Sequence, residues 1–119
     1  TLIRVLTDEE EITNPNLVKC VTDRKGFALY FSRSKIPYER NAGIATFYGH
    51  LGIYGYKRKA LETMTTLAQT PLECTESLEQ LRALENGMKI KTSVVDFVPV
   101  GIDTKEDLEK FRQILESKL

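Results

Sequence analysis

A short turn between two strand-like segments constrains the fold of this chain most strongly. Residues 23–26 read Asp-Arg-Lys-Gly, with Asp at the first position and Gly at the last, as tight turns favour. Residues 17–22 before the turn are typical of a strand. Residues 27–32 after it alternate in polarity and place one set of side chains on a common face: Phe27, Leu29 and Phe31. The pattern predicts a β-hairpin.

Further strand and helix signals follow in order along the chain. Thr70 and Glu73 have the spacing of a capping box, and Pro71 suits a first helical turn, so a helix is expected to begin there and to end at residues 86–87, Asn-Gly. A stripe on the last helix is expected to be buried: Leu108, Phe111, Ile114 and Leu115. The remaining expected elements are strands at 1–6, 49–56 and 88–95, a long irregular segment at 33–47, and helices at 57–68 and from 104 onward.

This order predicts a mixed α/β unit, and the length of 119 residues suits one domain or part of one. The chain begins at Thr1 directly in a strand-like run, which suggests that the front of a larger protein is missing.

Composition excludes several classes of protein. The 17 basic and 17 acidic residues give a formal net charge of zero, which argues against a nucleic-acid binder and against a polybasic membrane-surface protein. No apolar run approaches the roughly 20 residues that span a bilayer. The two cysteines lie far apart and no secretory signal is visible, so we expect a cytoplasmic protein.

No glycine-rich phosphate loop, nucleophile elbow or metal-binding pair of histidines is visible, so the polar residues are weighed singly. His50 and Tyr54 are four residues apart and would point from one face of a strand toward a polar ligand. The same spacing also fits an ordinary half-buried histidine and a tyrosine that packs on a helix.

Five further residues, which fall into three sets, have two interpretations each. Glu76, Glu79 and Gln80 would share a helical face that holds ligand hydroxyls, or they are a solvated face. The guanidinium of Arg33 would donate two parallel hydrogen bonds to a carboxylate or phosphate, or Arg33 is an ordinary surface arginine. Asp103 would bind Mg²⁺, or it only favours the positive end of the following helix.

The same positions lie within a series of motifs that resembles the C-terminal half of the 3-deoxy-D-manno-octulosonate (Kdo) cytidylyltransferases, also called CMP-Kdo synthetases. The resemblance extends over nearly all of the chain. The motifs, in order, are Asn14-Pro15-Asn16, residues 28–34 with Ile36-Pro37, residues 50–56 (His-Leu-Gly-Ile-Tyr-Gly-Tyr), Pro71-Leu72-Glu73, residues 78–82 (Leu-Glu-Gln-Leu-Arg), and residues 101–104 (Gly-Ile-Asp-Thr) with 106–108.

The resemblance implies the C-terminal part of a Rossmann-like nucleotidyltransferase fold, with a mixed sheet and flanking helices. Residues 1–119 would be the sugar-binding and dimerisation half of a homodimeric cytidylyltransferase whose nucleotide-binding half is absent. The enzyme would join CTP and Kdo into CMP-Kdo for lipopolysaccharide synthesis and release pyrophosphate, with Mg²⁺ as cofactor.

The resemblance also implies roles for the residues weighed above. Asp103 matches a magnesium ligand. Five positions match residues that surround the sugar acid: Arg33, His50, Tyr54, Glu79 and Gln80. An acylneuraminate cytidylyltransferase and a non-catalytic sugar-binding or dimerisation fragment remain as alternatives. The isolated chain is expected not to turn over CTP and Kdo, because it lacks a phosphate loop.

Overall fold

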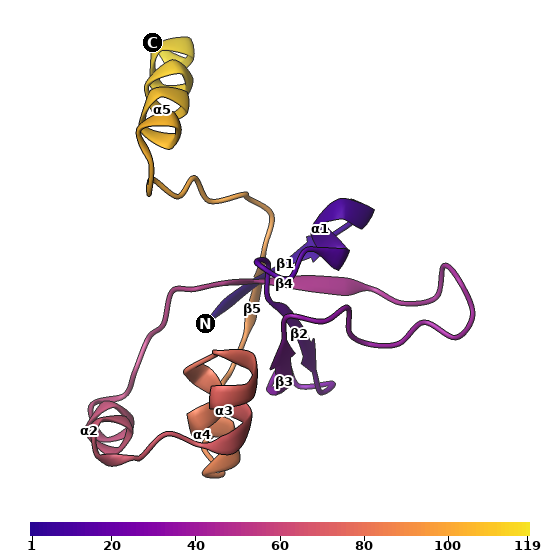
Figure 1. Cartoon of the computed structure of the whole chain (residues 1–119), viewed down its shortest axis with the longest axis vertical. Coiled ribbons are helices and arrows are strands. Elements are labelled where there is room, and N and C mark those ends of the chain that lie inside the picture. The colour runs from indigo at the N-terminus through magenta and orange to yellow at the C-terminus, as the bar shows by residue number, and fades with distance from the viewer.

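The computed structural model describes all 119 residues and contains one five-stranded mixed sheet (Figure 1). The strand order is β3-β2-β4-β1-β5. β1 runs antiparallel to β4 and parallel to β5, and β2 runs antiparallel to β3 and β4. The strands are β1 (Leu2–Leu6), β2 (Lys19–Thr22), β3 (Ala28–Ser32), β4 (Phe47–Leu51) and β5 (Ser93–Val95). The helices are α1 (Glu9–Thr13), α2 (Arg58–Thr66), α3 (Pro71–Glu76), α4 (Gln80–Glu85) and α5 (Lys105–Lys118). The predicted mixed α/β class is confirmed.

The predicted hairpin is present as β2 and β3. The carboxylate of Asp23 accepts hydrogen bonds from the N–H groups of Lys25 at 2.8 Å and Phe27 at 2.9 Å. Gly26 has φ +85°, a left-handed conformation that glycine adopts without a Cβ penalty. Asp and Gly therefore act at the two ends of the turn as their positions predict.

Two strands differ from the predicted ranges. β4 lies at residues 47–51 instead of 49–56, because the N–H of Ile53 turns back to donate to the carbonyl of Leu51 at 2.7 Å and ends the ladder. The stretch predicted as a strand at 88–95 is regular only in β5. Its earlier residues hydrogen-bond to the hairpin instead, through Ala28 N–H to the Ile90 carbonyl and Thr92 N–H to the Gly26 carbonyl.

The helix expected between Thr70 and residues 86–87 is two helices. Ser77 has φ 54° and ψ 50°, the left-handed conformation that ends α3, and α4 begins three residues later. Helix α1 was not predicted from the acidic run at residues 8–11. Asp8 caps it by accepting from the N–H of Glu10 at 3.1 Å, and glutamates in its first turn suit the positive end of a helix.

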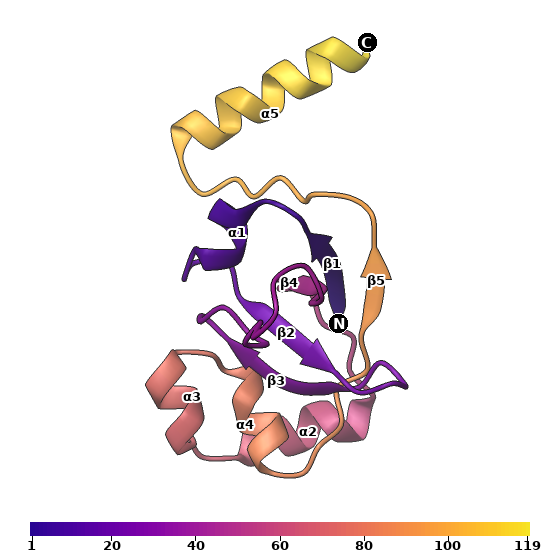
Figure 2. The same cartoon turned by 90° about the vertical axis from the view of Figure 1, so that its right-hand side faces the viewer.

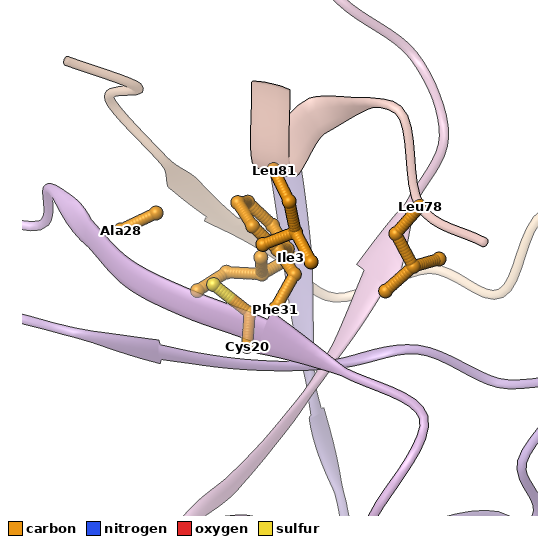
Figure 3. Close-up of a cluster of buried hydrophobic side chains, with 6 residues drawn as sticks. All are labelled: Ile3, Cys20, Ala28, Phe31, Leu78 and Leu81. Atoms are coloured by element: carbon orange, nitrogen blue, oxygen red, sulfur yellow. The ribbon is translucent and has the colours of Figure 1, made fainter. Parts of the chain in front are cut away.

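The main core joins the sheet to α4 and the segment before it. It consists of Ile3, Cys20, Ala28, Phe31, Leu78 and Leu81 (Figure 3). Cys20 and Cys74 are both free thiols, and burial raises the pKa of Cys20 to about 12. A second cluster on β1, α1 and β4 consists of Leu6, Ile12 and Phe47. These two clusters fix the sheet between α1 and the α3–α4 pair.

The last helix does not bury the stripe that its sequence predicts. No residue of α5 is buried, and Leu108, Ile114 and Leu115 are exposed. In both views α5 lies at the opposite end of the molecule from α2, α3 and α4, at the end of the extended segment 96–104 (Figures 1 and 2). This segment carries α5 away from the sheet. The apolar periodicity of residues 108–115 therefore predicted the helix correctly, but the helix has no packing partner within the chain.

Candidate functional site

A cavity of about 630 Å³ opens where the sheet meets α2 and α4. Its walls combine an apolar surface with several polar groups, and none of its lining residues is acidic. The lining residues are Thr1, Phe27, Tyr54, Gly55, Tyr56, Lys57, Ala60, Met64, Gln80, Ala83, Met88, Lys89, Ile90 and Lys91. A mostly apolar cavity with a few convergent polar groups is the usual form of a small-molecule site.

His50 lies beside this cavity near the end of β4, and its ring contacts two aromatic rings. The centroid of Phe31 lies 4.8 Å away in an edge-on arrangement, and that of Tyr54 lies 5.4 Å away. The Nε2 atom of His50 is 2.9 Å from the Oγ1 atom of Thr1. Burial lowers the pKa of His50 to about 4, so the ring is neutral near pH 7.

Tyr54 and Gln80 both line the cavity, and they come from different elements. Tyr54 follows the end of β4, so it does not share a strand face with His50 as predicted, but the two rings still meet. Gln80 is the first residue of α4. Burial raises the pKa of Tyr54, and the charge of Glu79 adds to the shift, so Tyr54 is a phenol that can donate a hydrogen bond.

The three polar residues predicted on one helical face are separated by the break at Ser77. Glu76 ends α3, whereas Glu79 directly precedes α4 without a capping hydrogen bond from its side chain and is exposed in a separate pocket that includes Arg82. The carboxylate of Glu76 accepts from Ser32 Oγ at 2.7 Å and from the Arg33 N–H at 2.9 Å, so it holds the end of β3. Of this predicted set, only Gln80 lines the cavity.

Arg33 directly follows β3, lies against the end of α3 and is half-buried. Its guanidinium donates to the carbonyls of Glu76 at 2.7 Å, Pro15 at 3.0 Å and Ser77 at 3.2 Å. These contacts join the loop before β2 to the end of α3. Arg33 thus holds two backbone segments together through hydrogen bonds, and it does not line the cavity.

Asp103 precedes α5 and is exposed. Its N–H donates to the carboxylate of Asp107 at 3.2 Å, and its own carboxylate oxygens accept no hydrogen bond. Mg²⁺ commonly binds through one or two carboxylates together with water and substrate phosphates, so this carboxylate fits a magnesium ligand. The structure contains no group of three or more His, Cys, Asp or Glu side chains that could hold a metal ion.

The cavity is also lined by a threonine and three lysines that the sequence did not single out: Thr1, Lys57, Lys89 and Lys91. Lys89 and Lys91 place their ammonium groups 5.4 Å and 4.7 Å from the centroid of the Phe27 ring. None of the three lysines forms a salt bridge with a carboxylate of this chain. Their charges were visible in the sequence, but only the fold brings residue 57 close to residues 89 and 91.

No helix of the chain is long and apolar enough to cross a lipid bilayer.

The chain belongs to the cytidylyltransferase family, because the model of that family matches residues 1–90. It is 51% identical over 123 residues to the 3-deoxy-manno-octulosonate cytidylyltransferase of Rhizobium meliloti (strain 1021), covering 100% of this chain and 48% of the relative. It is 50% identical over 122 residues to the protein of the same name from Chloroherpeton thalassium, covering 100% of this chain and 50% of the relative.

A solved structure of CMP:2-keto-3-deoxy-manno-octonic acid synthetase complexed with CTP superposes with a TM-score of 0.94 and 41% identity. The match covers 100% of this chain and 49% of the solved chain. The fold is therefore that of part of a nucleotidyltransferase, and the resemblance read from the sequence motifs is confirmed. The chain spans about half the length of the curated relatives that it matches.

Proposed function

We propose that the full-length gene product transfers CMP from CTP to Kdo and releases pyrophosphate, and that this chain supplies the pocket for the sugar acid. The cavity carries this proposal, because it joins Tyr54 and Gln80 to three lysines and has no acidic lining. The names of relatives about 50% identical to the chain support the reaction. The CTP in the solved relative supports the nucleotide.

The chemistry of the sugar acid suits these groups. Kdo carries one carboxylate and several hydroxyls. The ammonium groups of Lys57, Lys89 and Lys91 form no salt bridge within the chain and would attract the carboxylate, although Lys91 also donates to the carbonyl of Lys25. Tyr54 can donate a hydrogen bond, and the Gln80 amide can donate and accept, so both suit hydroxyls. Glu79, next to Gln80, is proposed to accept from a further hydroxyl.

In the proposed reaction, the anomeric hydroxyl oxygen of Kdo forms a bond to the α-phosphorus of CTP. The bond between that phosphorus and the bridging oxygen of pyrophosphate breaks, and the hydroxyl proton is released. The residues of this chain hold the sugar acid so that its hydroxyl lies in line with the leaving group, and such positioning supplies much of the catalysis in phosphoryl transfer. Arg33 supports the pocket by fixing the end of α3.

Asp103 is proposed to hold Mg²⁺ through its free carboxylate. When bound, the ion polarises the phosphate and neutralises the charge that develops on it.

We also propose that the gene product is a cytoplasmic homodimer that makes CMP-Kdo for lipopolysaccharide. Besides the resemblance, an apolar surface on the hairpin would favour a dimer, and the aromatic residues of the hairpin are Phe27, Tyr30 and Phe31. Phe31 cannot contribute to that surface, because it is 0% exposed in the core. The better support is β3, an outer strand of the sheet whose Leu29 is 62% exposed. If sedimentation of the full-length gene product at high micromolar concentration shows only a monomer, that result would contradict the proposed dimer.

The proposed activity is tested by incubating the full-length gene product with CTP, Mg²⁺ and Kdo and by following CMP-Kdo and pyrophosphate. We expect product with Kdo and little with N-acetylneuraminate. Product formed preferentially from N-acetylneuraminate would favour the acylneuraminate alternative. Failure to form product from either sugar acid would contradict the proposal and favour a non-catalytic role.

A further inference from the structure

The hydroxyl of Thr1 lies among three polar atoms at the end of the sheet. Its Oγ1 atom is 2.7 Å from the carbonyl oxygen of Ile53, 3.3 Å from that of Leu51 and 2.9 Å from Nε2 of His50. Thr1 is held there by its backbone, because its carbonyl accepts from the N–H of Ser93 at 3.1 Å. The hydroxyl is therefore fixed at the position where β1 and β5 begin and β4 ends.

The number of protons available in this cluster determines which ring nitrogen of His50 carries its proton. A carbonyl oxygen can only accept, and a threonine hydroxyl has a single proton. The proton of Thr1 must therefore point to the carbonyls of Ile53 and Leu51. The Oγ1 atom can then only accept from His50, which places the imidazole proton on Nε2.

The other ring nitrogen is left as an acceptor. A neutral imidazole with its proton on Nε2 has a lone pair on Nδ1. The Nδ1 atom of His50 has no hydrogen-bond partner in the chain. The only fully buried side-chain nitrogen or oxygen without a partner is Oγ1 of Thr70, so Nδ1 is not sealed from solvent or a ligand. The ring lies against Tyr54, which lines the cavity.

We propose that Thr1 is a positioning residue that holds His50 in the Nε2–H tautomer, so that Nδ1 accepts a hydrogen bond from a hydroxyl of the bound ligand. An Nδ1 lone pair repels a carboxylate and attracts a hydroxyl proton. The histidine therefore selects the hydroxyl side of a sugar acid, and the carboxylate is left to the lysines. The identity of the ligand rests on the proposed function, whereas the tautomer rests only on the geometry of the chain.

The tautomer is tested by long-range ¹H–¹⁵N correlation spectra of the 119-residue chain near pH 7. His50 is the single histidine, so its signals need no further assignment. We expect a protonated, pyrrole-like Nε2 and an unprotonated, pyridine-like Nδ1. Thr1→Val removes the hydroxyl and keeps the side-chain shape, and we expect the two nitrogen shifts to move toward each other as the tautomers mix.

Thr1→Ser retains the hydroxyl and should restore the wild-type spectrum. Thr63→Val is the matched control, because it removes an exposed hydroxyl of α2 and should change nothing. A wild-type spectrum with the proton on Nδ1 would overturn the assignment. A Thr1→Val spectrum identical to that of the wild type would overturn the role of Thr1.

The ligand role is tested by steady-state kinetics of the full-length gene product. Loss of one hydrogen bond predicts that Thr1→Val raises the KM for Kdo by roughly threefold to tenfold, with the KM for CTP unchanged and Thr1→Ser close to wild type. An unchanged KM for Kdo in an active Thr1→Val enzyme would contradict the ligand role alone. A wild-type protein that forms no CMP-Kdo would contradict the proposed function and the ligand role together, whereas the spectrum would still decide the tautomer.

Discussion

Arg82 in α4 donates two hydrogen bonds to the carboxylate of Glu73 in α3. The Nε atom lies 2.9 Å from Oε2, and Nη2 lies 2.5 Å from Oε1. The same carboxylate accepts from the N–H of Thr70 at 3.1 Å. The pair therefore joins the two short helices α3 and α4. Gln80, the first residue of α4, lines the cavity.

This pairing predicts a specific dependence of stability on pH. The hydrogen bond from Arg82 holds the pKa of Glu73 below its ordinary value of 4.5. A depressed pKa means that the pair stabilises the fold fully above pH 4.5 and that this contribution is lost as the pH falls through the folded-state pKa. Glu73→Gln should lower the urea midpoint near pH 7, and the difference from wild type should shrink in acid.

The measurement is urea unfolding of the wild type and of Glu73→Gln at a series of pH values from neutral to acidic. Glu62→Gln is the control, because the salt bridge of Glu62 with Arg58 is exposed and should contribute little. A Glu73→Gln difference that stays constant from neutral to acidic pH would contradict the pH dependence.

The core prediction concerns Leu81, which is 0% exposed and packs between α4 and the sheet. Leu81→Ala removes buried methyl groups and leaves a cavity, so it should cost about 2–5 kcal/mol of the free energy of unfolding. Leu72→Ala is the matched control at an exposed helical position, and it should cost much less. Equal losses for the two variants in urea titrations would contradict the described core.

The metal prediction concerns Asp103. If its carboxylate binds Mg²⁺, Asp103→Asn in the full-length gene product should lower turnover by roughly a hundredfold or more and raise the Mg²⁺ concentration needed for activity. If the carboxylate only interacts with the dipole of α5, turnover should stay within about threefold of wild type, with unchanged Mg²⁺ dependence. Folding should change little, because Asn can replace Asp near a helix start.

Local sequence signals predicted those elements whose cause lies within the element. The Asp23–Gly26 turn and the start of α3 at Pro71 are of this kind, because turn and capping chemistry acts over three or four residues. The break at Ser77 was missed because serine adopts a left-handed conformation only when its surroundings impose it. The apolar stripe of α5 predicted a helix correctly, but periodicity cannot say what the helix packs against.

The site was predictable only where the residue type itself indicated a ligand. Tyr54 and Gln80 were predicted and line the cavity, and His50 lies beside it. Thr1 and Lys91 were missed, because a threonine or lysine in a strand-like segment carries no local signal. They become part of the site only through the pairing of residues about 50 and 90 positions apart in the sequence.

The most direct test of the central claim is the kinetics of Gln80→Ala in the full-length gene product, with CTP and Kdo varied separately. Gln113→Ala on α5 is the matched control, because it makes the same change at an exposed helical position. If this chain forms the pocket for the sugar acid, Gln80→Ala should raise the KM for Kdo by roughly tenfold and leave the KM for CTP within twofold of wild type. A rise in the KM for CTP with an unchanged KM for Kdo would contradict the account.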